Sequence, residues 1–261
     1  MRIAVIGGTG VLSPEMLENV QESRVSTRYG EVEFKTGICR GEEVIFMARH
    51  GARHTIPPHL VNYRANIEAL RLLGVTRIIA TSAVGSLNPE MKPGDSVILD
   101  QFIDFTRGRI STFFEGGEMG VVHTDFTEPY CPEIRSCLIN AARSLGIPVH
   151  ERGCYVATEG PRFETPAEIR AFRILGGDVV GMTNVPECVL AREASICYGT
   201  VAIVTNFAAG ISPTPLTHEE VVQVMKENGD RLRNIIINSI AALPRERRCR
   251  CGQHKGALGC E

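Results

Sequence analysis

TVAIVTN, residues 200–206, is a run of apolar and β-branched side chains that ends in an asparagine. A run without polar alternation is typical of a strand that is buried on both faces of a sheet. Four other runs have the same character: RIAVIG (2–7), EVIFMA (43–48), RIIATSA (77–83) and SVILD (96–100). Because segments with helical patterns alternate with these runs, the sequence predicts an α/β fold, a single domain with a largely parallel or mixed sheet.

The helical segments carry apolar residues at helical spacing, as at Val61, Ile67 and Leu70. The last of them opens with THEE, where Thr217 is the expected N-cap and Glu220 its capping-box partner. The expected helices are 59–73, 132–145, 166–175, 186–197 and 217–242. Together these elements predict one domain over residues 1–244, followed by a Cys-rich basic tail, 245–261, that we expect to be mobile.

The bulk composition excludes several classes of protein. The 261 residues are 43 % hydrophobic, and 28 basic side chains nearly balance 30 acidic ones, which argues against broad binding to nucleic acid or anionic membranes. The apolar run at the N-terminus is far shorter than a signal-peptide core, and no stretch approaches the roughly 18 apolar residues of a membrane span. We therefore expect a cytoplasmic protein with no nucleic-acid or membrane partner.

Nine cysteines are more than a cytosolic chain usually carries. We interpret the six scattered ones as core thiols: Cys39, Cys131, Cys137, Cys154, Cys188 and Cys197. The other three lie in the tail, CRCGQHKGALGC, at Cys249, Cys251 and Cys260. A zinc knuckle that includes His254, a redox pair and an intersubunit disulfide all stay open for them.

Polar residues follow the carboxyl ends of the predicted strands, where open α/β sheets bind their ligands. GGTG (7–10) lacks the third glycine of a dinucleotide fingerprint and the lysine of a Walker A loop, which leaves a tight turn whose amides and Thr9 hydroxyl suit an anion. In ARHGARHTIPPH, Arg49 and His50 beside a glycine favour an oxyanion site over a zinc pair of His50 with His54. In TSAVGSL, Ser82 and the Ala83 amide are further phosphate donors, and no serine-hydrolase elbow is present.

Two later motifs supply candidates for binding an organic ligand. In EGPRFETPAEIRAF, Phe163 can stack on a planar ring, and Glu164 can accept hydrogen bonds from ring N–H groups. In GMTNVPE, Met182 and Thr183 come just before an expected helix.

Taken together, these motifs resemble the trimeric purine nucleoside phosphorylase and methylthioadenosine phosphorylase family. The resemblance runs from about residue 3 to 242 and rests on GGTG, RHG with HTIPPHLVNYRANI, TSAVGSL, PGDSVILDQFIDFT, ATEGPRFET, GMTNVPE and TNFAAG. It implies the nucleoside phosphorylase fold, a single α/β domain with a central mixed β-sheet flanked by helices. It also implies a homotrimer or a dimer of trimers, and a role in purine salvage. The implied reaction is phosphorolysis of a purine nucleoside to free base and ribose 1-phosphate, with inorganic phosphate as co-substrate and no metal or organic cofactor.

The resemblance also assigns roles to individual residues. Those implied to bind phosphate are Thr9, Arg49, His50, Ser82, Ala83 through its amide, and Thr183. Those implied to bind the nucleoside are Phe163, Glu164, Met182, Asn206, Phe207, Ala208 and His218, together with His123, which a neighbouring subunit would lend. His54 is a second-tier candidate near the phosphate.

The base preference follows from Asn206 and Glu164, which we expect to be the catalytic pair. An asparagine can donate to O6 of hypoxanthine or guanine and accept from a protonated N7, whereas an aspartate would repel O6. The Glu164 carboxylate can accept from N1–H and from the 2-amino group of guanine. In the family, Phe-Glu-Thr with this asparagine resembles the pattern of 6-oxopurine enzymes, so inosine and guanosine are the expected substrates.

Two alternatives stay open. The enzyme could instead be an S-methyl-5′-thioinosine or S-methyl-5′-thioadenosine phosphorylase, depending on what surrounds the 5′ end at His218. From another class, it could be a non-catalytic nucleotide-binding or redox-sensing protein whose cysteine tail is the active part.

Overall fold

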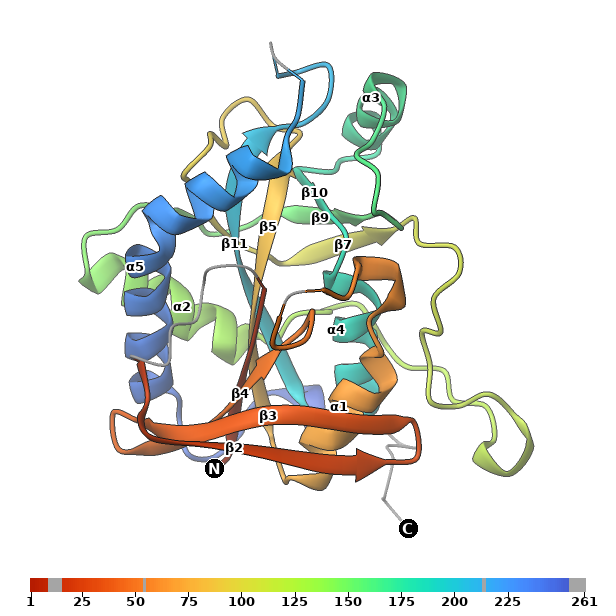
Figure 1. The fold of residues 1–261 in the computed structure, drawn as a ribbon, viewed down its shortest axis with the longest axis vertical. Helices are drawn as coiled ribbons and strands as arrows, with labels where there is room; N and C mark the ends of the chain where they lie inside the picture. The colour runs from red at the N-terminus through yellow and green to blue at the C-terminus, as the bar shows by residue number, and fades with distance from the viewer. Residues whose placement is uncertain (9–15, 54, 213–214, 254–261) are drawn as a thin grey trace.

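The computed structural model describes residues 1–8, 16–53, 55–212 and 215–253. Four parallel strands form its centre: β4 (Glu42–Ala48), β1 (Ile3–Gly7), β5 (Arg77–Ser86) and β11 (Cys197–Phe207), paired in that order (Figure 1). These strands contain four of the five buried runs that the sequence predicts, and β1 is buried at every residue. The fifth run supplies β6 (Ser96–Ile98), which pairs antiparallel with β11 and parallel with the short β8 (Val149–His150).

Antiparallel pairs elsewhere make the sheet mixed, as predicted. Beyond β5 the order continues through β10 (Val179–Gly181), β9 (Cys154–Ala157) and β7 (Gln101–Asp104), with β10 antiparallel to β5. At the other edge β4 pairs with a hairpin of β3 (Gly30–Cys39) and β2 (Glu18–Thr27). The strongly charged, mostly exposed β2 gives no buried apolar run, so the sequence analysis missed it.

Helices cover both faces of the central strands (Figure 1). On one side α2 (Pro132–Ser144) and α5 (His218–Ala242) pack together and against β11. On the other, α1 (Tyr63–Leu72) packs against α4 (Asn184–Glu193). The fifth helix is α3 (Pro166–Ile174), and single 3-10 turns occupy Pro58–Leu60, Gly117–Met119 and Arg250–Gly252. No helix in the described part of the chain is long and apolar enough to span a bilayer.

The predicted helix boundaries need two corrections. The helix expected over 59–73 begins only at Tyr63, after Pro58–Leu60 forms a separate 3-10 turn, and Asn62 caps it by accepting from the Ala65 amide. The helix expected over 186–197 ends at Glu193, because β11 already begins at Cys197. Thr217 caps α5 as predicted, its Oγ1 accepting from the Glu220 amide at 3.2 Å.

The first part of the tail is anchored to the domain, which contradicts the expectation that it is mobile. One oxygen of Glu133 accepts from the amides of Arg248 and Cys249, at 2.5 and 2.7 Å. The buried Arg77 side chain donates to the carbonyl of Glu246 at 3.3 Å. Residues 245–253 therefore pack on the start of α2, while His254 and Cys260 lie outside the described residues.

Candidate functional site

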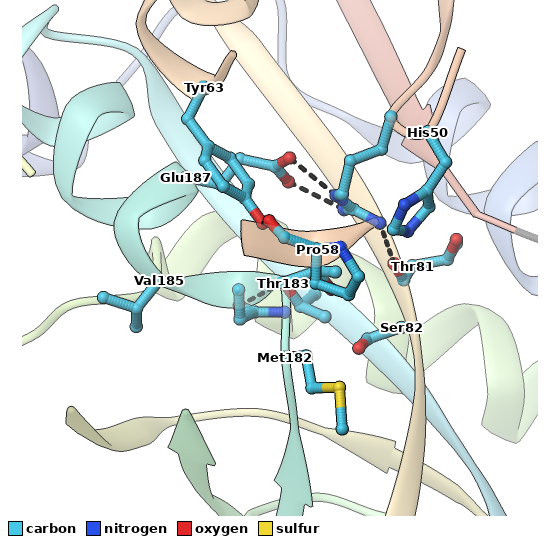
Figure 2. Close-up of polar contacts among 12 residues, drawn as sticks. His50, Pro58, Tyr63, Thr81, Ser82, Met182, Thr183, Val185 and Glu187 are labelled. Carbon is cyan, nitrogen blue, oxygen red and sulfur yellow. Dashed lines mark hydrogen bonds and ion pairs between the residues drawn. The ribbon is translucent and has the colours of Figure 1, made fainter. Parts of the chain in front are cut away.

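A cavity of about 370 Å³ lies where the carboxyl ends of the central strands meet. A volume in this range suits a small organic ligand. Figure 2 shows His50, Ser82, Met182 and Thr183 around one space, contributed by the segments after β4, within β5 and after β10. The fold thus gathers side chains that lie far apart in the sequence, as parallel strands with a common carboxyl edge require.

The most buried charge in this wall is the guanidinium of Arg49, which forms a two-pronged ion pair with Glu187. Its Nε and Nη2 donate to the two carboxylate oxygens at 2.7 Å each, and Nη1 donates to the Thr81 carbonyl at 3.0 Å (Figure 2). Tyr198 adds a hydroxyl bond to Glu187 at 2.7 Å. Burial alone would lower the pKa of Arg49, but Glu187 holds that pKa above its ordinary value, so the guanidinium stays charged.

His50 and the glycine loop complete the cationic end of the cavity. The Nδ1 atom of His50 lies 2.8 Å from the Ile56 carbonyl, a contact that favours a proton on Nδ1. A Cβ atom built on Gly8 would lie 3.8 Å from both Arg49 Nη1 and the His50 ring, so the backbone passes close to both groups. Ser82 and Ala83 line the same end. This end offers N–H and O–H donors beside the Arg49 guanidinium, whose charge Glu187 balances, and such donors suit an oxyanion.

At the other end a carboxylate and a carboxamide line the wall, and both are buried. Glu164 is 8 % exposed and accepts a hydrogen bond from the Thr158 hydroxyl at 2.7 Å. Burial raises the pKa of the Glu164 carboxyl, and the Thr158 bond opposes that rise. Phe163, at 39 % exposure, lies at the rim.

Asn206 enters the cavity through an irregularity in β11. The register with β5 shifts between Val204 and Asn206, which leaves Thr205 as an extra residue and redirects the chain. Asn206 Oδ1 accepts from the Thr205 hydroxyl at 2.8 Å, and Nδ2 donates to the Phe207 carbonyl at 3.0 Å. Because a backbone carbonyl can only accept, the Phe207 bond fixes which amide atom is nitrogen.

Most residues that the sequence singled out line this one cavity. They are Arg49, His50, Ser82, Ala83, Phe163, Glu164, Met182, Thr183, Asn206, Ala208 and His218. Phe207 does not line it: successive side chains of a strand point to opposite faces, so Phe207 turns away where Asn206 faces in. His123 lies in the long connection between β7 and α2, away from this chain's own cavity. Thr9 and His54 lie outside the described residues.

The sequence analysis missed Arg109, which ties together the segments that carry the cavity wall. Its Nη1 donates to the carbonyls of Met182 and Val185, at 2.6 and 2.8 Å. Its Nη2 donates to the carbonyls of Thr158 and Glu159, at 3.1 and 2.7 Å. In the sequence Arg109 stands in TRGRIS, which resembles an exposed basic loop, so no local signal marks it. Glu187 was quoted within GMTNVPE, but its partner Arg49 lies 138 residues away.

The geometry can now be compared with known proteins. The profile of the phosphorylase superfamily matches residues 2–241. The chain belongs to the phosphorylase superfamily. It is 61 % identical, over 99 % of both chains, to the 6-oxopurine nucleoside phosphorylase of Pyrococcus furiosus. It is 47 % identical to the S-methyl-5′-thioadenosine phosphorylase of Thermofilum pendens, over 97 % of this chain and 96 % of that one.

A solved structure of similar fold supports the assignment of this chain to the superfamily. It is a methylthioadenosine phosphorylase from an antarctic soil metagenomic library, with a TM-score of 0.90 and 40 % identity. The superposition covers 98 % of this chain and 90 % of that one. The family and the α/β fold expected from the sequence are therefore confirmed.

The burial of the Arg49–Glu187 pair generates a prediction about stability. Glu187→Gln keeps the size of the side chain but leaves the Arg49 charge buried without a counter-ion, which should cost about 3 kcal/mol or more. Urea unfolding measures the loss. Glu31→Gln, in the exposed Arg24–Glu31 pair, is the matched control and should cost under about 1 kcal/mol. Equal losses in the two variants would contradict the role given to the buried pair.

Proposed function

We propose that this protein catalyses the phosphorolysis of 6-oxopurine nucleosides, inosine and guanosine, to free base and ribose 1-phosphate with inversion at C1′. Inorganic phosphate is the co-substrate, and the reaction uses no metal or organic cofactor. The observation that carries the proposal is the single cavity in which a buried carboxylate and carboxamide face the donors around Arg49 and His50. The name of the Pyrococcus furiosus relative agrees with this reaction.

The hydrogen-bonding capacity left on Asn206 matches a 6-oxopurine. Thr205 occupies one lone pair of Oδ1, and the Phe207 carbonyl takes one N–H of Nδ2. One donor and one acceptor remain, and they pair with O6 and a protonated N7. Thr158 occupies one oxygen of Glu164, which leaves the carboxylate free to accept N1–H and the 2-amino group of guanine.

The charges of the reaction fit the two ends of the cavity. Arg49, His50, Ser82, the Ala83 amide, Thr183 and Thr9 hold the phosphate dianion below C1′. C–N cleavage runs ahead of phosphate attack, so the ribosyl group gains positive charge and the base gains negative charge. The phosphate stabilises the first, and Asn206 and Glu164 stabilise the second. Each such preorganised contact is worth about 3–4 kcal/mol, or 10²–10³-fold in rate.

The sugar and the assembly complete the proposal. Met182 lies against the ribose, Phe163 stacks on the base, and Ala208 borders it. His123 comes from a neighbouring subunit, so the active site is complete only in a homotrimer or a dimer of trimers. The enzyme works in the cytoplasm, in purine salvage.

One observation favours S-methyl-5′-thioinosine as a second candidate substrate. Around His218 the cavity is lined by Leu216, Val221 and Met225, whose apolar side chains can accommodate a methylthio group. The histidine itself favours a 5′-hydroxyl, to which it can donate or from which it can accept.

A base-release assay tests the proposed reaction. Inosine, guanosine, adenosine and their 5′-methylthio analogues are incubated with and without phosphate, and the free bases are quantified. Inosine and guanosine should be cleaved only with phosphate, and their kcat/KM should exceed that of adenosine by up to about 10⁴-fold. Faster cleavage of adenosine would overturn the base assignment, and binding without base release would favour a non-catalytic protein.

Asn206→Asp should reduce kcat/KM for inosine at least about 10²–10³-fold. The new carboxylate can donate neither to O6 nor to the Phe207 carbonyl, so it repels both. Steady-state phosphorolysis measures the effect. Asn238→Asp makes the same chemical change on the surface of α5 and should leave the rate unchanged. Undiminished turnover by the Asn206 variant would show that this side chain does not bind the base.

Glu164→Gln should impair inosine and guanosine while sparing adenosine, and it should change the pH profile. Because burial raises the pKa of Glu164, protonation removes its acceptor at a higher pH than for an exposed glutamate. Wild-type kcat/KM should therefore fall as the pH drops through that pKa, and the variant should lose this part of the decline. Glu90→Gln, at an exposed site, is the control. If the Glu164 variant kept the pH profile of the wild type, or lost as much activity on adenosine as on inosine, the N1 contact would be contradicted.

A further inference from the structure

Four cysteines from three separate segments converge at the end of β11 opposite the cavity. They are Cys131, just before α2, Cys197, the first residue of β11, and Cys249 and Cys251 of the tail. Their four sulfur atoms all lie within 4.8 Å of one another, and Cys197 and Cys249 are 3.4 Å apart. Three of the residues are buried and Cys249 is partly buried. In the sequence Cys131 and Cys197 look like scattered core thiols, apart from the tail.

The spacing suits a single tetrahedral metal ion. Zinc–sulfur bonds of about 2.3 Å place the four sulfurs of a tetrahedron roughly 3.8 Å apart. Because no two of the four sulfur atoms are more than 4.8 Å apart, the thiols need to move closer by about 1 Å at most around such an ion. Four sulfur ligands in tetrahedral geometry are typical of structural zinc.

Only some of the cysteines in the described part of the chain belong to this cluster. Four further described cysteines, Cys39, Cys137, Cys154 and Cys188, do not belong to it. Two of them, Cys39 and Cys188, are as buried as the ligand candidates, so burial alone does not bring thiols together here. The convergence therefore needs an explanation beyond the tendency of cysteine to lie in cores.

Hydrogen bonds hold the backbone of each ligand segment in place. The Cys131 amide donates to the Tyr198 carbonyl at 2.7 Å, and the Cys197 amide donates to Thr76 at 3.0 Å. The Cys249 amide donates to Glu133 at 2.7 Å. Fixed ligand backbones of this kind orient the donor atoms before metal binding, as supporting contacts do in known metal sites.

Positive charge lies next to the cluster. Arg247 donates to the Ser195 carbonyl at 2.7 Å, and a Cβ atom built on Gly252 would lie 3.0 Å from its guanidinium carbon. Gly252 follows Cys251 directly, so this guanidinium lies beside the ligand loop. A zinc ion with four thiolates carries a net charge of −2, which an adjacent arginine offsets.

We propose that Cys131, Cys197, Cys249 and Cys251 bind one Zn²⁺ ion in a closed structural site that fastens the tail to the domain. Four S–H bonds break and four Zn–S bonds form, four protons leave to solvent, and no atom changes oxidation state. The ligands differ from those of a tail-only zinc knuckle, because two of them come from the domain. Asn206 lies nine positions after Cys197 along the strand, roughly 30 Å away, so the site stands apart from the proposed reaction.

Metal analysis of the full-length protein tests the site. Elemental mass spectrometry on protein purified without chelators should find one zinc per chain. In denaturant, thiol titration should find four more reactive thiols with EDTA present than without it. Exchange with Co²⁺ should give the visible absorption of tetrahedral cobalt thiolate. The proposal would be overturned if the purified protein holds no zinc and binds none after refolding with Zn²⁺. It would also be overturned if mass spectrometry finds disulfides among these four cysteines.

Variants separate the ligands from the other thiols. Cys249→Ser and Cys251→Ser should lower bound zinc at least tenfold and lower the Tm, while phosphorolysis well below that Tm stays unchanged. Cys137→Ser and Cys39→Ser are the controls and should retain one zinc per chain. Zinc retained in both tail variants, or lost equally in the controls, would refute the ligand set. If a tail variant fails to fold, the metal content and thiol count of the unaltered protein still decide.

Discussion

The architecture of the cavity depends on one buried ion pair, Arg49 with Glu187. A lone guanidinium at this depth would carry a large desolvation cost, and the two 2.7 Å bonds to Glu187 with the Tyr198 hydroxyl offset it. The pair joins the end of β4 to α4, two elements that the chain forms far apart. Because Nε and Nη2 of Arg49 both donate to Glu187, its Nη1 atom is held at the cavity wall near Gly8. The positive charge is thus positioned by the fold before any anion arrives, which is the condition for electrostatic preorganisation.

The strand β11 links this chemistry to the remainder of the molecule. It is buried along almost its whole length and pairs with β5 through ten residue pairs, so it is held firmly in the sheet. Its carboxyl end supplies Asn206 through the bulge at Thr205, and its amino end supplies Cys197. A metal ion at Cys197 would fix the end at which β11 enters the sheet and leave the bulge, the irregular end, to ligand binding. One rigid strand can serve both because its two ends face different surroundings.

The sequence predicted those features that local pattern determines and missed those that need long-range contact. Buried strands such as β1 and β11 appear as apolar runs, and Arg49, Ser82 and Asn206 were indicated by their position at or just after the carboxyl ends of such runs. Glu187 and Arg109 had no local signal, because the ionic partner of Glu187, Arg49, lies 138 residues away and the partners of Arg109 lie at least 46 residues away. The cysteines show the same limit: Cys131 and Cys197 look like ordinary core thiols until the tail folds back onto them.

If Asn206 contacts the base as proposed, the backbone geometry around its amide sets the base selectivity. Side-chain amides can usually rotate by half a turn and exchange donor with acceptor, which would let one asparagine serve 6-oxo and 6-amino purines alike. Here the Phe207 carbonyl, part of β11 itself, accepts only from Nδ2, and rotation would set two oxygens against each other. The Thr205 hydroxyl donates to Oδ1 in this orientation, but a hydroxyl can also accept, so the Phe207 carbonyl sets the orientation. The remaining donor is therefore held by the strand and not by the substrate, so in the proposed contact a 6-amino group would meet a fixed donor that cannot adapt to it.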